Sequence, residues 1–131
     1  MVRNITLLCL LLITLNSCKK IEGQGGSSEI LGKVYFQDRD INGNAVGDKY
    51  PAQDVRVYII YGPDGNFHND DYRSSYDGSY RFEFLTNGTY KIFAYQECVS
   101  CQSGDEPVIK TVTIDSKNSS VVVSNIVLDN Y

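Results

Sequence analysis

The segment Asp77-Gly78-Ser79-Tyr80-Arg81-Phe82-Glu83-Phe84 decides the fold class of this chain. From position 80 its aromatic residues alternate with charged ones, and this period of two is typical of a strand with one buried face. The Asp-Gly pair at its start is favoured in tight turns between antiparallel strands. The segment therefore predicts a β-strand that enters from a tight turn and packs its aromatic face on a core.

Similar short runs lie on both sides of this segment, separated by turn residues and without sustained helical periodicity. In the last run the apolar phase changes, and a β-bulge near Ser124-Asn125 would return its apolar residues to the core. Seven strands in about 103 residues are typical of a β-sandwich, so we expect an all-β, seven-stranded Greek-key sandwich. The expected strands are residues 30–37, 55–61, 72–76, 80–84, 90–95, 112–114 and 121–128.

The composition limits the functions open to the chain. Its 131 residues are enough for one domain and too few for a multi-domain enzyme. Twelve Lys and Arg against sixteen Asp and Glu leave no basic excess, so we expect no nucleic-acid partner. The single His argues against a Ser-His-Asp hydrolase or a multi-His metal centre. We therefore expect no enzyme and assign no catalytic residue.

The N-terminus predicts export. One positive charge in residues 1–4 precedes the apolar run 5–15, which would rise only about 16 Å as a helix and cannot span a bilayer. The following Leu15-Asn16-Ser17-Cys18 resembles the bacterial lipobox. That resemblance implies a signal peptide over residues 1–17 and lipidation of Cys18, because a diacyl or triacyl cysteine anchors stably. An ordinary secreted protein with a free Cys is the alternative.

The residues after Cys18 bear on localisation. Lys19 stands where an Asp would retain a lipoprotein at the inner membrane, so the resemblance implies lipid anchoring to the outer membrane. Lys19-Lys20-Ile21-Glu22 also resembles the export tags of Bacteroidetes surface lipoproteins, and both the periplasm and the cell surface remain open. We expect residues 18–28 to form the lipidated Cys and a flexible tether, and residues 29–131 to form the domain.

Five segments of the domain, in this order, resemble bacterial transthyretin-like (prealbumin-like) modules, which include the collagen-adhesin B-type, SdrD B-like and carboxypeptidase regulatory-like domains. The resemblance implies a transthyretin-like sandwich but no single function, since these modules serve as stalks, adhesins and sugar-binding accessories. The His and Arg cluster and the C-terminal motif of transthyretin-like hydrolases have no counterpart here. The segments are residues 32–34, 38–43, 54–58, 77–82 and 85–91.

The acidic stretch 38–48 resembles the structural calcium loop of the SdrD B-like modules. That resemblance implies Asp38, Asp40, Asn42 and Asp48 as ligands of a structural calcium ion. Oxygen ligands at alternate positions followed by Gly match the first half of an EF-hand loop. Lys49 stands where the bidentate Glu would be. The alternative is a solvated Asn-Gly turn whose carboxylates cap the local backbone. We expect no other cofactor.

Cys98-Val99-Ser100-Cys101 forms a C-x-x-C motif that follows an expected strand. A thioredoxin-type motif needs a helix beginning at the first Cys to stabilise the thiolate, and this segment offers none. In an oxidising envelope we expect Cys98 and Cys101 to form a local disulfide. Redox activity, free thiols and a zinc site with the only His, His68, are the alternatives.

The ten Tyr residues suggest ligand binding without identifying a ligand site. Tyr58, Tyr72, Tyr76 and Tyr95 are surface candidates for stacking on sugars, although most Tyr residues in a sheet pack across strands. We expect a lipid-anchored, non-enzymatic interaction or adhesion module of the cell envelope, with a protein or glycan ligand. The alternative is a glycan-binding accessory lipoprotein of a polysaccharide-uptake system.

Overall fold

The computed structural model describes residues 21–131, so the predicted signal peptide and Cys18 lie outside the described residues. This part of the chain contains nine strands and no helix, and hence no helix that could cross a membrane. The prediction of an all-β domain is confirmed. The strands are β1 (Gln24–Arg39), β2 (Ala45–Pro51), β3 (Arg56–Tyr61), β4 (Asp70–Arg73), β5 (Ser79–Leu85), β6 (Gly88–Glu97), β7 (Asp105–Ile114), β8 (Ser120–Val122) and β9 (Ile126–Asn130).

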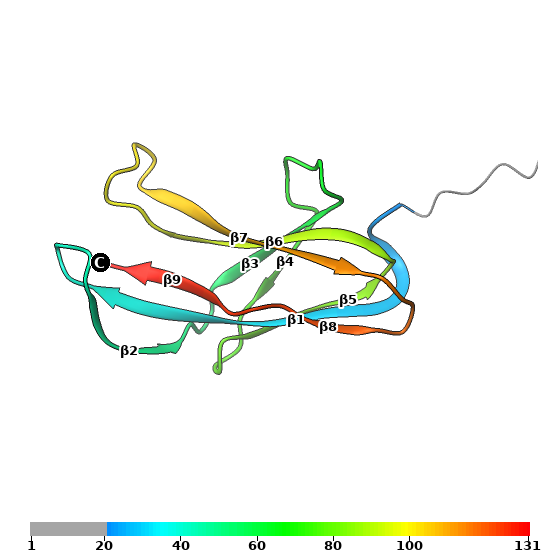
Figure 1. Cartoon of the computed structure of the whole chain (residues 1–131), viewed down its shortest axis with the longest axis horizontal. Helices are drawn as coiled ribbons and strands as arrows, with labels where there is room; N and C mark the ends of the chain where they lie inside the picture. The colour runs from blue at the N-terminus through cyan, green and yellow to red at the C-terminus, as the bar shows by residue number, and fades with distance from the viewer. Residues whose placement is uncertain (1–20) are drawn as a thin grey trace, which may run out of the picture.

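The strands form two layers (Figure 1). In one sheet the long strand β1 is central: β5 and β8 flank its first half, and β2 and β9 flank its second half. The other sheet is antiparallel, with the order β4-β3-β6-β7. The two-sheet sandwich expected from the sequence is therefore confirmed, although it has nine strands rather than seven.

The core fills the space between the sheets. Alternate residues of the central strands point into it, as Val57 and Ile59 of β3 and Tyr90 and Ile92 of β6 do. Burying these side chains supplies the main favourable free energy of folding. The core cluster consists of Ile30, Val34, Ala52, Val57, Ile59, Tyr80, Phe82, Leu85, Tyr90, Ile92, Ala94, Val112, Ile114, Val123, Ile126 and Leu128.

Phe84 departs from the expected alternation. It is 68% exposed, whereas Leu85 is buried in the position that the sequence pattern assigns to Phe84. The cause is a local change of backbone: Phe84 adopts φ 58°, in the left-handed region. The pairing of β1 with β5 is irregular at the same place, since Gln24 and Ser28 both pair with Leu85. This bulge reverses the side-chain phase at the end of β5.

Two other strands differ from expectation. The stretch expected as a calcium loop is a hairpin, because its second half, β2, pairs with β1; β2 is exposed throughout, so it shows no apolar alternation. The expected last strand is divided into β8 and β9 by residues 123–125. The predicted bulge was expected to return the apolar residues on both sides to the core. The break has this effect, because Val123, Ile126 and Leu128 are all buried.

The flexible tether predicted for residues 18–28 ends earlier than expected, because Gln24–Ser28 belong to β1. The amide of Gly23 donates to the Tyr90 hydroxyl at 3.0 Å. The buried hydroxyl of Ser28 donates to the carbonyl of Ser116 at 3.0 Å. A Cβ atom on Gly26 would overlap the Leu85 carbonyl, so only glycine allows this approach. The chain is therefore fixed to the sandwich from Gly23 onward.

Candidate functional site

Four rings form an aromatic patch on the outer face of the β3-β6 sheet. Tyr58 of β3 pairs with Phe93 of β6, so the two side chains lie on the same face, opposite to the core. Their ring centroids are 5.0 Å apart and the rings are stacked. Tyr95 follows Phe93 by two residues in β6, and its ring centroid is 5.8 Å from that of Tyr58. His68 lies in the loop between β3 and β4, and its ring centroid is 4.7 Å from that of Tyr58. We call Tyr58, His68, Phe93 and Tyr95 the aromatic patch.

The patch contains one buried ring and rings that are partly exposed. Phe93 is only 7% exposed although it lies on the outer face, because the neighbouring rings cover it. Tyr95 remains 51% exposed, and Ile109 of β7, which pairs with Phe93, remains half exposed. Grouped aromatic side chains that are partly open to water are typical of interaction sites. The arrangement offers a rigid apolar surface of rings on a sheet.

Polar groups border the patch. Asp71 of β4 pairs directly with Tyr58 and forms an ion pair with Arg56 at 3.7 Å. These side chains and His68 could hydrogen-bond to a ligand that lies against the rings. The patch therefore has an apolar centre and a polar border, as protein interfaces commonly do.

The sequence identified half of this patch. Tyr58 and Tyr95 are surface residues as expected, and the structure brings them together. Tyr72 is elsewhere, with its ring against the edge of Phe82 of the other sheet at 6.4 Å. Tyr76 is exposed in the segment between β4 and β5. The sequence analysis did not place Phe93 or His68 in this patch. For Phe93 a signal was present: Phe93 and Tyr95 alternate with the core side chains of the same strand, which indicates an aromatic outer face.

A depression of about 500 Å³ lies at β1 and β5, and Tyr72 contributes to its lining together with Tyr80 and Arg81. A smaller hollow of about 240 Å³ shares Tyr72 and Arg81 with it. Pockets of several hundred Å³ with an apolar lining and a few polar groups are typical of small-molecule sites. Tyr72 is thus a predicted sugar-stacking residue that lines both depressions.

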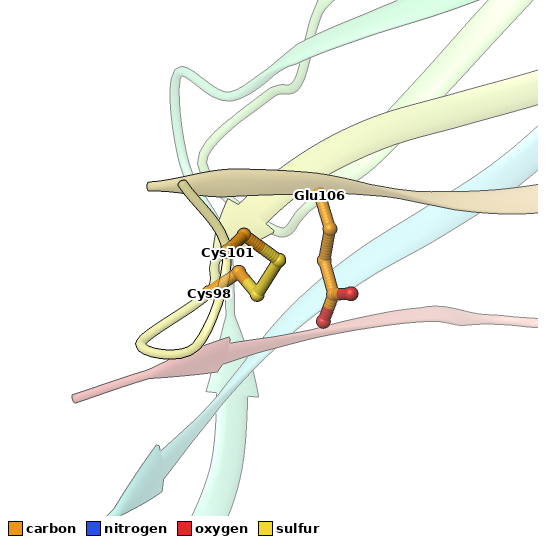
Figure 2. Close-up of side chains that lie close together, drawn as sticks. All are labelled: Cys98, Cys101 and Glu106. Atoms are coloured by element: carbon orange, nitrogen blue, oxygen red, sulfur yellow. A yellow bond between two sulfur atoms is a disulfide. The ribbon is translucent and has the colours of Figure 1, made fainter. Parts of the chain in front are cut away.

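The predicted disulfide between Cys98 and Cys101 is present in the turn between β6 and β7, with the Cα atoms 5.3 Å apart. The turn is closed by the amide of Cys98, which donates to the carbonyl of Gly104 at 2.8 Å. Figure 2 shows the Glu106 carboxylate beside the two sulfur atoms. Among residues 21–131, these three form the only group of three or more His, Cys, Asp or Glu side chains close enough to share a metal ion, but sulfur atoms bonded to each other offer no thiolate to a metal.

The side chains around the disulfide link the β6-β7 hairpin to the other sheet. The Gln96 amide donates to Glu106 at 2.7 Å, and its oxygen accepts the backbone N–H of Asp129, in β9, at 3.0 Å. His68, the alternative zinc ligand, lies instead in the aromatic patch. The geometry assigns the Cys98–Cys101 pair a structural role at the hairpin tip.

The four predicted calcium ligands lie in one hairpin. Asp38 lies in β1 and Asp48 in β2, while Asp40 and Asn42 lie in the turn between these strands. Within the described part of the chain, no group of three Asp, Glu, His or Cys ligands includes Asp38, Asp40 or Asp48. Calcium binding by these residues stays a prediction.

The carboxylates of this hairpin accept hydrogen bonds from the chain itself. Asp40 accepts the backbone N–H groups of Asn42 and Asn44 at 2.9 and 2.8 Å, and the Asn44 side chain at 3.0 Å. Asp38 accepts the Asn130 amide at 3.0 Å and the Tyr50 hydroxyl at 2.9 Å. These bonds, led by those from Asn44 and from Asn130, hold the pKa values of Asp40 and Asp38 below their ordinary range. The hairpin therefore has the capped backbone that was expected of a solvated Asn-Gly turn, the alternative to a calcium loop.

No family model matches the chain, and no curated protein matches its sequence. The solved structures that are similar in fold include the following two. One, from Pseudomonas aeruginosa, is of a protein that has been proposed to bind carbohydrate; it is 15% identical, with a TM-score of 0.48 over 82% of this chain and 91% of that one. The other is (S)-allantoin synthase, 15% identical, with a TM-score of 0.41 over 80% of this chain and 42% of that one. The chain is thus a β-sandwich module distantly similar in structure to these proteins.

Proposed function

We propose that this chain is a lipid-anchored, non-enzymatic interaction module of the cell envelope, and that its aromatic patch binds a partner protein. The patch carries the proposal: stacked rings on a rigid sheet, half-exposed Tyr95 and Ile109, and a border of charged groups match the composition of protein interfaces. Aromatic residues in such a setting contribute a large share of binding free energy.

The anchor would hold the domain close to the membrane. If Cys18 carries the lipid, only residues 19 and 20 separate it from Ile21, whose carbonyl accepts a hydrogen bond from the Thr86 hydroxyl of the sandwich. Three extended residue steps span at most about 11 Å. The β1-β2 and β6-β7 turns lie at the end of the long axis opposite to the start of the described chain (Figure 1). An anchored domain could therefore present these turns away from the lipid surface and leave the patch on its flank.

Site-specific crosslinking in cells that express the full lipidated chain tests this function. A photo-reactive amino acid in place of Tyr95 should crosslink to one defined protein, and Tyr58→Ala should remove that product. The control is the same replacement at Tyr76, which is even more exposed, at 81% against 51% for Tyr95, and lies outside the patch. Identical products from the two positions, or a Tyr95 product that survives Tyr58→Ala, would contradict the proposal.

A second candidate function is glycan binding, as an accessory lipoprotein of a polysaccharide-uptake system. The specific observation is that Tyr72 lines two adjoining depressions, where its ring can stack on the apolar face of a sugar. Binding on a glycan array that Tyr72→Ala abolishes and Tyr76→Ala leaves intact would support this function. No binding to any glycan would refute it.

A further inference from the structure

The tip of the β6-β7 hairpin holds three side chains that carry metal-binding atoms. They are Cys98, Cys101 and Glu106, whose sulfur and carboxylate oxygen atoms all lie within 4.8 Å of one another (Figure 2). Two donor atoms on one tetrahedral zinc ion lie about 3.5–4 Å apart, because each bond to zinc is about 2.0–2.3 Å long. The group therefore has nearly the size of a zinc site, although its two sulfur atoms are bonded to each other in this structure.

Backbone hydrogen bonds hold the two cysteines in this turn independently of the disulfide. The amide of Cys98 donates to the carbonyl of Gly104 at 2.8 Å, and the amide of Gly104 donates to the carbonyl of Cys101 at 3.1 Å. The ladder between β6 and β7 continues up to the turn, where Glu97 pairs with Asp105. Reduction of the disulfide should therefore leave the two thiols side by side in the same turn.

A neighbouring side chain holds Glu106 beside the sulfur atoms. Gln96, which pairs with Glu106 in the ladder, donates to one of its oxygens at 2.7 Å, and the Gln96 oxygen accepts the N–H of Asp129 at 3.0 Å. Carboxylates that bind metals are commonly oriented by such hydrogen bonds. Glu106 makes no ion pair within the described part of the chain, and residues 96–106 contain no Lys or Arg. Its charge is therefore free to meet a cation at the tip.

We infer that the reduced form of this hairpin binds a zinc ion through Cys98, Cys101 and Glu106, with water in the fourth position. In the redox step, a protein dithiol transfers two electrons and two protons to the disulfide. The S–S bond breaks, both sulfur atoms become thiols, and the dithiol is oxidised to its own disulfide. Zinc then displaces the two thiol protons. The oxidised hairpin offers no thiolate, so the redox state of the pair controls zinc binding.

The donor set favours zinc over other metals. Calcium and magnesium prefer oxygen ligands and would use only Glu106. Copper(I) prefers soft sulfur ligands and would leave the carboxylate unused. Iron–sulfur clusters need more cysteine or histidine ligands than this turn supplies. Zinc accepts thiolates and a carboxylate together, and three protein ligands with water in the fourth position are an established arrangement for it. The site depends neither on the aromatic patch nor on the lipid anchor.

The test is calorimetric titration of the full lipidated chain in detergent with a zinc salt, with and without a phosphine reductant. The reduced protein should bind one zinc ion per chain, and the oxidised protein none. Cobalt(II), as a spectroscopic substitute, should give a thiolate-to-metal absorption band only in the reduced protein. Glu106→Gln should weaken zinc binding about tenfold or more. The matched control is Glu97→Gln, which alters a carboxylate bonded to the N–H of Tyr131 and should leave zinc binding unchanged.

Two further variants test the ligand set. The Cys98→Ser/Cys101→Ser double variant should bind no zinc in either redox state. His68→Ala should bind zinc as the wild type does, because His68 lies in the aromatic patch. Zinc binding by the oxidised protein, no binding by the reduced protein, or loss of binding in His68→Ala would overturn the site. Unchanged affinity in Glu106→Gln would overturn the assigned third ligand.

A stability measurement shows whether the ion binds the folded chain. A ligand that binds only the folded state raises the melting temperature. Zinc should therefore raise the melting temperature of the reduced wild type and leave that of the oxidised wild type unchanged. The same rise in both redox states, or in the double cysteine variant, would place the zinc elsewhere and overturn the inference.

Discussion

The hydroxyl of Tyr90 donates a hydrogen bond to the carbonyl of Thr86 at 2.7 Å, back across the turn between β5 and β6. The same oxygen accepts the amide of Gly23 at 3.0 Å. The Thr86 hydroxyl in turn donates to the carbonyl of Ile21 at 3.0 Å. Thr86 of this turn and Tyr90 of β6 thereby fix the first described residues of the chain to the sandwich.

Tyr90→Phe should lower the free energy of unfolding by about 1–3 kcal/mol, because it leaves the amide of Gly23 and the carbonyl of Thr86 short of a buried partner. Chemical denaturation of wild type and variant measures the difference. Tyr80→Phe is the matched control, since it removes an equally buried hydroxyl that has no partner. Equal losses in the two variants would show that the Tyr90 bonds contribute nothing specific.

The Cys98–Cys101 disulfide should be quantitative in the purified protein, with no thiol titre for this pair until a reductant is added. Because the bond closes a loop of only four residues, its reduction should lower stability by about 2 kcal/mol or less. Thiol titration and thermal unfolding with and without reductant measure both effects. The Cys98→Ser/Cys101→Ser double variant should have the stability of the reduced protein, and the reductant should not change it. Full thiol titre without reduction would contradict the structural disulfide.

Lipidation at Cys18 remains a prediction from the lipobox resemblance, because that residue lies outside the described part of the chain. Cys18→Ala should abolish incorporation of labelled palmitate and move the protein to the soluble fraction, since no other lipid attachment is expected. Cys9→Ala, which makes the same replacement within the apolar run and leaves Leu15-Asn16-Ser17-Cys18 intact, serves as a control for expression and export. Unchanged membrane retention of Cys18→Ala would refute the lipid anchor.

The sequence was a good guide wherever one face of a strand is buried. The period of two through Tyr80 and Phe82, and through Tyr90, Ile92 and Ala94, predicted side chains that the structure places in the core. It failed at Phe84, where a left-handed backbone changes the phase without any change in residue type. It also failed at β2, which buries no side chain and so has no apolar pattern to detect.

The first residues of β1 show how composition can mislead. Gly25, Gly26 and Ser28 are residue types common in flexible linkers, yet they belong to the strand, and Gly26 permits its close approach to Leu85. The site was harder still to predict. Tyr58 joins Phe93 and Tyr95 only through the pairing of β3 with β6, which lie far apart in the chain. Register of that kind cannot be read from one sequence without the partners of each strand.

The hairpin between β1 and β2 allows a direct test of capping against calcium binding. Asp40→Ala should lower the melting temperature by the same amount in calcium and in chelator, because the variant loses the hydrogen bonds to Asn42 and Asn44 rather than an ion. Asp48→Ala, at an exposed position of β2, is the control and should leave the melting temperature unchanged. A rise in melting temperature with calcium that Asp40→Ala abolishes would restore the calcium interpretation.

The pH dependence of the same hairpin follows from the sign of its pKa shift. Hydrogen bonds, chiefly from the Asn44 side chain, hold the pKa of Asp40 in the folded protein below its ordinary value. A carboxylate with a lowered folded pKa contributes stability above its unfolded pKa and loses that contribution as the pH falls through the folded pKa. Wild type should therefore lose stability below about pH 4 more steeply than Asp40→Ala. Parallel pH profiles for the two proteins would show that the cap does not act through the ionised carboxylate.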